Sequence, residues 1–94
     1  MAKLTAEQIA MGLAGLPGWS EENGELVKTF TFSTFPEGIA FVDRVAEAAE
    51  EMGHHPDITI SYNRITMRLS THSEGGVTAN DLALASRIEV AARG

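Results

Sequence analysis

Residues 57–69 read DITISYNRITMRL, and their pattern is the clearest indication of a β-sheet in the chain. Apolar and polar side chains alternate in it twice, with a break near Asn63. Alternation with a period of two is typical of a strand that buries one face. The apolar positions are Ile58, Ile60 and Tyr62 before the break and Ile65, Met67 and Leu69 after it. The stretch therefore predicts an antiparallel hairpin with one apolar and one polar face.

A helix is predicted before this hairpin, over residues 36–52. Pro36 suits a first helical turn, and the apolar residues that follow it recur at helical spacing. They are Phe41, Val45, Ala48, Ala49 and Met52. Gly53 is a plausible C-cap, and Pro56 prevents the helix from continuing. The two residues between them, His54 and His55, are thus expected in a short loop of fixed geometry.

A second helix is predicted after the hairpin. Gly75-Gly76 breaks the preceding strand, and Thr78 with Asp81 has the spacing of a capping box. The helix that follows has a wide apolar stripe made of Leu84, Ala85, Ile88, Ala91 and Ala92. In this interpretation Asp81 is first of all a helix-capping residue.

The N-terminal third predicts one more helix and one more hairpin. Thr5 and Gln8 again have capping-box spacing, so a helix is expected from about Ala6 until Pro17-Gly18. Asn23-Gly24 is a strong signal for a two-residue hairpin turn. The strands that it joins are residues 19–22 and 25–32.

The resulting order is helix, two strands, helix, two strands, helix. Two antiparallel hairpins separated by a helix fit an α+β fold, a four-stranded antiparallel sheet that carries three helices on one face and stays polar on the other. At 94 residues, the chain has room for one hydrophobic core, so residues 1–94 are expected to form a single domain. Because so small a core gives modest stability, self-association is expected.

Composition excludes several classes of function. The absence of cysteine rules out disulfides, thiolate nucleophiles and cysteine-ligated metals, and it favours a reducing cytoplasm. A net charge of −6 repels phosphate backbones and argues against nucleic-acid binding. The apolar stretches are too short for a membrane span or a signal peptide. A small ligand or a protein partner is therefore expected.

The three histidines are the candidates for chemistry. His54 and His55 precede the third strand, and His72 is expected on the polar face of the fourth, beside Ser70 and Arg68. Antiparallel pairing brings the start of one strand beside the end of the other, so the three imidazoles are predicted to converge. Imidazoles both donate and accept protons near neutral pH, which favours acid–base catalysis.

Other interpretations of these residues stay open. Loop histidines are often only surface residues, and three imidazoles also suit zinc, although adjacent His54 and His55 do not easily face one metal. Glu50 either orients an imidazole by a hydrogen bond or is an exposed helical glutamate. Tyr62 is either part of the core or an aromatic that stacks on a flat heterocycle.

The same residues form a pattern that resembles the pterin-4a-carbinolamine dehydratase family. The pattern consists of the run from Glu50 to His54-His55-Pro56, then Tyr62, then Ser70-Thr71-His72, then Asp81, each at the family's spacing. The resemblance is best over residues 30–88. One departure is Ile58, because animal members commonly carry an aromatic residue close after the proline.

The resemblance implies an enzyme that eliminates water from 4a-hydroxytetrahydropterin, the product of aromatic amino acid hydroxylases, to give quinonoid dihydropterin. It implies no cofactor and no metal, a pterin as the small-molecule partner, and assembly as a homodimer or homotetramer. His55 would be the principal acid/base at N5, while His54 and His72 hold and polarise the hydroxyl. The residues that would bind or orient substrate are Glu50, Tyr62, Ser70, Thr71 and Asp81.

The resemblance also implies two alternatives to this activity. Animal members act as dimerisation partners of a homeodomain transcription factor, so one alternative is a non-catalytic interaction module. The other is a dehydratase-like protein of a different pterin pathway, which would use the same proton transfers.

Overall fold

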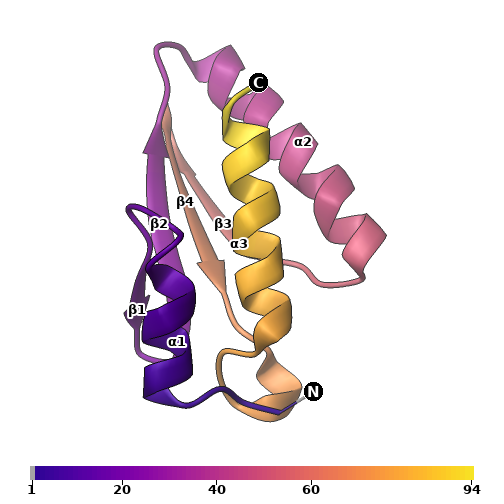
Figure 1. Cartoon of the computed structure of the whole chain (residues 1–94). Coiled ribbons are helices and arrows are strands. Elements are labelled where there is room, and N and C mark those ends of the chain that lie inside the picture. Colours follow the sequence, from indigo (N-terminus) through magenta and orange to yellow (C-terminus); the bar gives the residue numbers. More distant parts are fainter. Residues whose placement is uncertain (1) are drawn as a thin grey trace.

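The chain folds as three helices packed on one face of a four-stranded antiparallel sheet (Figure 1). The computed structural model describes residues 2–94. The elements are α1 (Ala6–Leu13), β1 (Ser20–Glu22), β2 (Glu25–Thr31), α2 (Phe35–Met52), β3 (Asp57–Ser61), β4 (Arg64–Leu69), a 3₁₀ helix (His72–Glu74) and α3 (Ala79–Ala92). This order and architecture confirm the predicted α+β fold.

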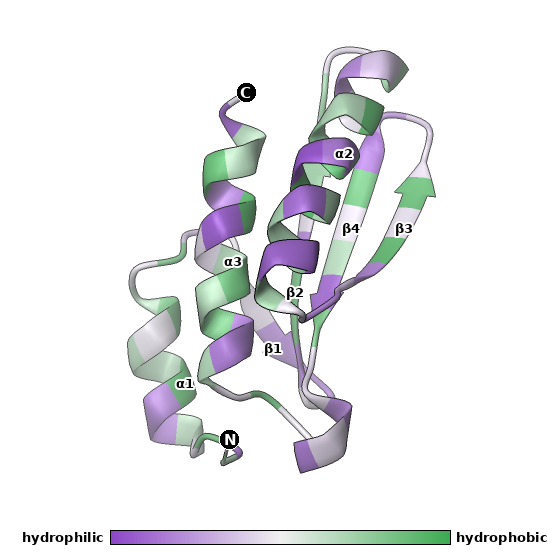
Figure 2. Ribbon diagram, turned by 90° about the vertical axis from the view of Figure 1, so that its right-hand side faces the viewer, coloured by the Kyte–Doolittle hydropathy of each residue, from purple (hydrophilic) through white to green (hydrophobic). Residues whose placement is uncertain are grey.

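The strands lie in the order β1-β2-β4-β3, so β4 is interior and β3 forms one edge. Alternation places Ile65, Met67 and Leu69 of β4 beneath the helices, where they are buried. On the opposite face Thr66 lies across from Thr29, and their hydroxyls are hydrogen-bonded at 2.8 Å. Figure 2 shows the helices on one side of the sheet only. The predicted apolar and polar faces are both present.

Two-residue turns close both hairpins. Asn23 and Gly24 have φ of 52° and 80°, the left-handed pair that the Asn-Gly signal predicts. The second turn differs from the prediction, because Tyr62 also has a positive φ of 53° and lies in the turn with Asn63. Tyr62 therefore does not continue the apolar face of β3.

Each of the three helices begins after a threonine whose side chain caps it. Both predicted capping boxes are present, at Thr5 and at Thr78. The first helix is shorter than predicted: it ends at Leu13, and the chain continues in tight turns before Pro17. Low helix propensity at Gly12 and Gly15 accounts for the early end. No helix in residues 2–94 has the length and apolarity needed to cross a bilayer.

The core lies between the sheet and the pair α2 and α3. Its fully buried side chains include Phe41, Val45, Leu84 and Ile88, at the positions that the helical periodicity predicts. The stem of Lys28 lies on the same sheet face, with Nζ 4.7 Å from the centre of the Phe30 ring. Burial of these apolar stripes is the main source of stability.

The segment between β4 and α3 contradicts one prediction. The fourth strand ends at Leu69, so His72 does not continue its polar face but begins the 3₁₀ helix. Thr71 pairs with Gly76 as an isolated bridge, and Gly75 has a φ of 75°. This pairing closes residues 72–75 into a tight loop, because Gly75 permits the left-handed turn that returns the chain to Gly76.

Candidate active site

The loop between α2 and β3 is fixed at its start by Gly53. This residue ends α2 in the left-handed conformation, with a φ of 61°. The backbone N–H of His54 then donates to the carbonyl of Ala49 at 3.1 Å, which is the bond of a Schellman-type helix end. The position of the two adjacent histidines is therefore set by the cap, as the sequence predicts.

His54 points inward, toward the N-terminus of α3. Its Nε2 lies 2.5 Å from Oδ1 of Asp81. The His54 side chain is 14% exposed and that of Asp81 is fully buried. A hydrogen bond to a carboxylate fixes both the orientation and the tautomer of an imidazole. Asp81, which caps the start of α3, therefore also positions His54.

The second oxygen of Asp81 is held by two donors. Oδ2 accepts the Thr71 hydroxyl at 2.9 Å and the Thr78 backbone N–H at 2.8 Å. Because Thr71 gives its single proton to Asp81, the Thr78 hydroxyl must donate to Thr71 Oγ1, 2.8 Å away. His54, Asp81, Thr71 and Thr78 thus form one hydrogen-bonded network. The sequence analysis assigned Thr78 only to a cap, and its capping-box spacing was the signal for its place here.

His55 points outward and meets a different carboxylate. Its Nε2 lies 2.6 Å from Oε1 of Glu50 in the last part of α2. Both side chains are exposed, His55 to 60% and Glu50 to 78%. Glu50 is therefore an exposed helical glutamate that also contacts an imidazole, and its role in orienting that imidazole for catalysis stays a prediction.

The remaining sequence-predicted residues fall into two places. Ser70 and His72 flank Thr71, so the backbone on either side of Thr71 is tied to the network around Asp81. The His72 side chain itself is exposed. Tyr62 lies at the other end of β3 from the histidines, in the turn, where its ring stacks on Phe35 with centroids 6.5 Å apart. A single chain does not bring Tyr62 into the network.

The two adjacent histidines share one chemical arrangement. Each has Nε2 on a carboxylate, and within the described residues no hydrogen bond is made by Nδ1 of either ring. An imidazole held in this way can take up a proton at the free nitrogen while the carboxylate stabilises the resulting charge. In residues 2–94, no three His, Cys, Asp or Glu side chains are grouped closely enough to hold a metal ion.

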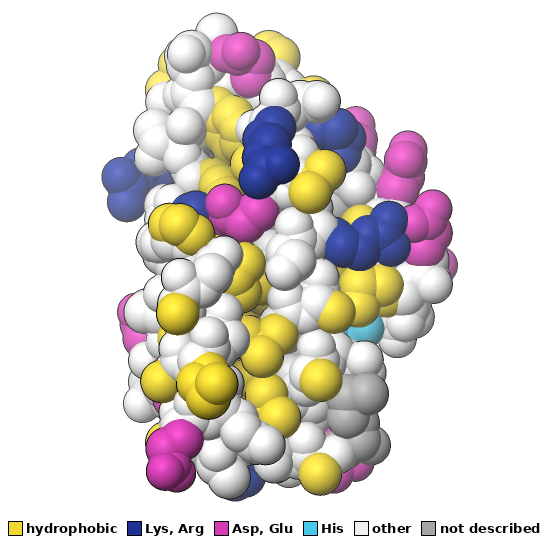
Figure 3. Space-filling view, viewed as in Figure 1, with side chains coloured by type: hydrophobic (Ala, Val, Ile, Leu, Met, Phe, Trp, Pro, Cys, Tyr) yellow, Lys and Arg dark blue, Asp and Glu magenta, His cyan; other side chains and the backbone are white. Residues whose placement is uncertain are grey.

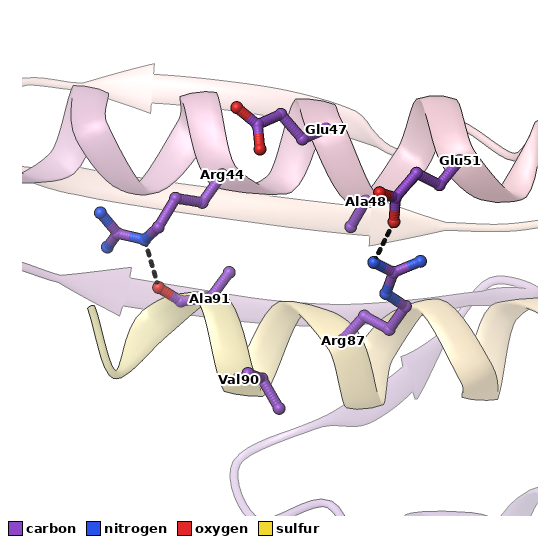
Figure 4. Close-up of a pocket in the computed structure, with 7 residues that line it drawn as sticks. All are labelled: Arg44, Glu47, Ala48, Glu51, Arg87, Val90 and Ala91. Atoms are coloured by element: carbon purple, nitrogen blue, oxygen red, sulfur yellow. Dashed lines mark hydrogen bonds and ion pairs between the residues drawn. The ribbon is translucent and has the colours of Figure 1, made fainter.

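A separate groove lies on the helical side, between α2 and α3. Figure 4 shows its lining residues, which are Arg44, Glu47, Ala48, Glu51, Arg87, Val90 and Ala91. Arg87 pairs with Glu51 across it, and Arg44 Nε donates to the carbonyl of Ala91 at 2.8 Å. In the space-filling view, basic side chains gather over the upper parts of these helices, and little of a histidine is visible (Figure 3). The contacts across the groove therefore connect the two helices. The groove is distinct from the histidine site.

Comparison with protein families gives one match that covers nearly the whole chain. The family model described as pterin 4 alpha carbinolamine dehydratase matches residues 2–91. A protein of Mycobacteroides abscessus is 54% identical over 95% of this chain and 95% of its own length. One of Thermomicrobium roseum is 51% identical over 94% of this chain and 95% of its own length. Both carry the name "Putative pterin-4-alpha-carbinolamine dehydratase".

Two solved structures are similar to this fold. One is described as a transcriptional coactivator/pterin dehydratase from Brucella melitensis. It has a TM-score of 0.93 and 33% identity, and the match covers 96% of this chain and 98% of that one. The other is described as a pterin dehydratase-like protein that is a RuBisCO assembly factor in the alpha-carboxysome. Its TM-score is 0.66 at 25% identity, over 79% of this chain and 86% of that one.

Proposed function

Because the chain belongs to the pterin-4-alpha-carbinolamine dehydratase family, we propose that it dehydrates 4a-hydroxytetrahydropterin to quinonoid dihydropterin. The observation that carries the proposal is the pair of adjacent histidines, His54 and His55, each with Nε2 on a carboxylate and with no hydrogen bond at Nδ1 from residues 2–94. Acid–base groups held in this way suit a reaction that consists of two proton transfers.

The reaction needs no change of oxidation state. The C4a–O bond breaks and its electron pair leaves with the hydroxyl, which takes up a proton and departs as water. The proton on N5 is lost, and the N5 electrons form the C4a=N5 double bond. The protein therefore has to supply one base at N5 and one acid at the hydroxyl, and the proposal requires neither metal nor cofactor.

His55 is proposed as the base at N5. It is the more exposed of the two adjacent imidazoles, so a flat substrate has access to its free nitrogen. Glu50 orients the ring and balances the positive charge that His55 gains when it accepts the proton.

His54 and His72 are proposed to hold and protonate the departing hydroxyl. The buried Asp81 orients the imidazole of His54 by a hydrogen bond, while Thr71 ties the segment that carries His72 to the same carboxylate. Backbone groups at Ser70 and Thr71 are proposed to bind the pterin ring.

A stopped-flow assay of carbinolamine dehydration tests this proposal. Wild-type protein should accelerate the decay of the carbinolamine, and each of His54→Ala, His55→Ala and His72→Ala should lower turnover. The loss should be near 100-fold, at the lower end of the range for acid–base groups, because the N5 lone pair already helps to expel the hydroxyl. Glu50→Gln should lower turnover less, and Glu47→Gln, one turn earlier on α2, is the matched control that should not.

A protein-interaction role is the second candidate. It is favoured by the two solved relatives, whose descriptions name transcriptional coactivation in one case and assembly of another protein in the other. The same assay separates the candidates. If wild-type protein leaves the spontaneous dehydration rate unchanged while it remains folded, the catalytic proposal is wrong and the interaction role takes its place.

A further inference from the structure

The hydroxyl of Thr78 makes one contact that capping of α3 does not need. As the N-cap residue, Thr78 accepts the backbone N–H of Asn80 at 3.3 Å, and this bond uses only lone pairs of its oxygen. The hydroxyl proton remains. Because Thr78 is fully buried, a proton without an acceptor would be costly. The proton therefore goes to Thr71 Oγ1, 2.8 Å away in the loop between β4 and α3.

Thr34, the N-cap residue of α2, shows what capping alone requires. Its hydroxyl accepts the backbone N–H of Glu37 at 3.2 Å and donates to Oε1 of the same residue at 3.1 Å. Both contacts stay within the first turn of α2, and Thr34 is exposed. At Thr78 the donated bond instead reaches a different segment of the chain. Capping therefore explains the bond that Thr78 accepts but not the bond that it donates.

Thr78, Thr71 and Asp81 form a relay of hydrogen bonds with a fixed direction. Asp81 Oδ2 accepts the Thr71 hydroxyl at 2.9 Å. Thr71 has a single hydroxyl proton, so with that proton on Asp81 its oxygen can only accept from Thr78. The direction from Thr78 through Thr71 to Asp81 thus gives each of the two hydroxyl protons an acceptor.

Thr71 anchors the loop that carries His72. Its backbone N–H donates to the carbonyl of Gly76 at 2.9 Å and closes the loop on itself. Its side chain ties the closed loop to Asp81 at the start of α3. In Figure 1 the 3₁₀ helix of this loop lies below the first turn of α3. Because His72 is the next residue along the chain, the place of its imidazole depends on this anchor.

Asp81 connects this loop to the loop of His54. One of its oxygens, Oδ1, lies 2.5 Å from His54 Nε2, and the other holds Thr71. His54 follows α2 and His72 follows β4, so the two histidines come from separate segments. The spacing between these segments is therefore set by one buried carboxylate and by the groups that fix its two oxygens.

We infer that Thr78 is a positioning residue of the dehydratase site, which acts on His54 and His72 through Thr71 and Asp81. The inference rests on the proposed function, in which these two histidines hold the departing hydroxyl. The donated proton of Thr78 keeps the Thr71 hydroxyl directed at Asp81. Without this donor the Thr71 hydroxyl can exchange Asp81 for water, because Thr71 is only partly buried. The loop of His72 then loses its tie to α3.

Thr78→Val tests the donated bond, because it removes the hydroxyl with little change in shape. The extended backbone at residue 78, with φ of −124° and ψ of 178°, accommodates a β-branched side chain. In the stopped-flow assay Thr78→Val should lower kcat/KM by roughly three- to tenfold, the effect of one hydrogen bond between neutral groups. Thr78→Ser keeps the donor and should stay within about twofold of wild type.

Thr34→Val is the matched control for the loss of a capping hydroxyl. It removes the same kind of side chain from the start of α2, whereas the histidine loop follows the end of that helix. Its kcat/KM should equal that of wild type. All variants are compared at a temperature at which circular dichroism shows each of them folded. A loss in Thr34→Val as large as in Thr78→Val, or a Thr78→Ser variant as impaired as Thr78→Val, would overturn the inference.

A double-mutant cycle tests whether Thr78 acts through Thr71. Thr71→Val should lower kcat/KM by at least about tenfold, because it removes a hydrogen bond to a charged group. In the Thr71→Val background, Thr78→Val should cause no further loss, since the relay is already broken. Additive losses, or wild-type kcat/KM in folded Thr78→Val, would contradict a positioning role.

Hydrogen exchange followed by NMR tests the relay without reference to activity. The Thr71 N–H is bonded to Gly76, so its exchange rate reports opening of the loop. Thr78→Val should raise this rate by roughly three- to tenfold, while Thr78→Ser and Thr34→Val leave it unchanged. An unchanged rate in Thr78→Val would overturn the tie between Thr78 and the loop. If wild-type protein has no dehydratase activity, the proposed function fails, and exchange at Thr71 alone decides whether Thr78 holds the loop.

Discussion

Replacing His54 by alanine should destabilise the fold, whereas the same change at His55 should leave its stability nearly unchanged. The two residues are adjacent, and each imidazole bonds one carboxylate. They differ in burial, because His54 is 14% exposed against a fully buried Asp81, while His55 and Glu50 are both largely exposed. Water replaces the lost hydrogen bond at Glu50 but has little access to Asp81.

The size of the expected difference in stability between the two variants follows from the contacts of Asp81. The carboxylate accepts one bond at Oδ1 from His54 and two at Oδ2. Leaving a buried acceptor unsatisfied costs about 1–3 kcal/mol, and since two of three bonds remain, we expect about 2 kcal/mol for His54→Ala. For a domain of this size, that corresponds to a Tm about 8–16 °C lower. The cost at exposed His55 should stay within about 0.5 kcal/mol.

Urea and thermal melts followed by far-ultraviolet circular dichroism measure both changes. Protein concentration is held constant, because the Tm of a protein that self-associates depends on it. His54→Gln keeps an N–H donor for Asp81 and should recover at least half of the lost stability, although it carries no proton to a substrate. Equal destabilisation by the two alanine variants, or a larger loss at His55, would refute the reasoning.

Three further outcomes are expected. Gly53→Ala should cost about 1–2 kcal/mol in urea melts, since alanine is unfavourable at a φ of 61°. Lys28→Met should destabilise by about 1–3 kcal/mol and shift Trp19 fluorescence, because Lys28 Nζ and Trp19 Nε1 both bond Glu89 Oε2, at 2.7 and 2.8 Å. Dialysis against EDTA should leave dehydration kinetics unchanged, and activity restored only by added zinc would replace the acid–base account with a metal-dependent one.

Local signals were sufficient to predict most of the fold. Alternation in residues 57–69 identified the hairpin and its buried face, and the Asn23-Gly24 turn identified the other hairpin. The capping residues Thr5 and Thr78 marked two helix starts at the correct positions. These signals succeed because each depends on neighbours within a few residues, so no tertiary contact is needed to interpret them.

The predictions that failed concern positions where the backbone conformation interrupts the alternation of apolar and polar residues. Tyr62 completes the alternation of β3, yet it adopts a positive φ that aromatic residues rarely show, because a two-residue turn requires it there. His72 is in phase with Ser70, but the bridge between Thr71 and Gly76 ends the strand first. Neither the turn conformation nor the bridge has a local sequence signature that outweighs the clear alternation of apolar and polar residues.

The contacts of Asp81 explain why the sequence predicted only part of the candidate site. The spacing of Thr78 and Asp81 identifies a cap, and a helix N-terminus is where a carboxylate is most favourable. Capping occupies Oδ2 and leaves Oδ1 as a strong acceptor that no local group satisfies. The imidazole that satisfies it comes from 27 residues away, brought there by the packing of α2 against α3. Because that imidazole donates from Nε2 to a carboxylate, the start of α3 determines that Nδ1 is the nitrogen of His54 that would exchange a proton in the proposed reaction.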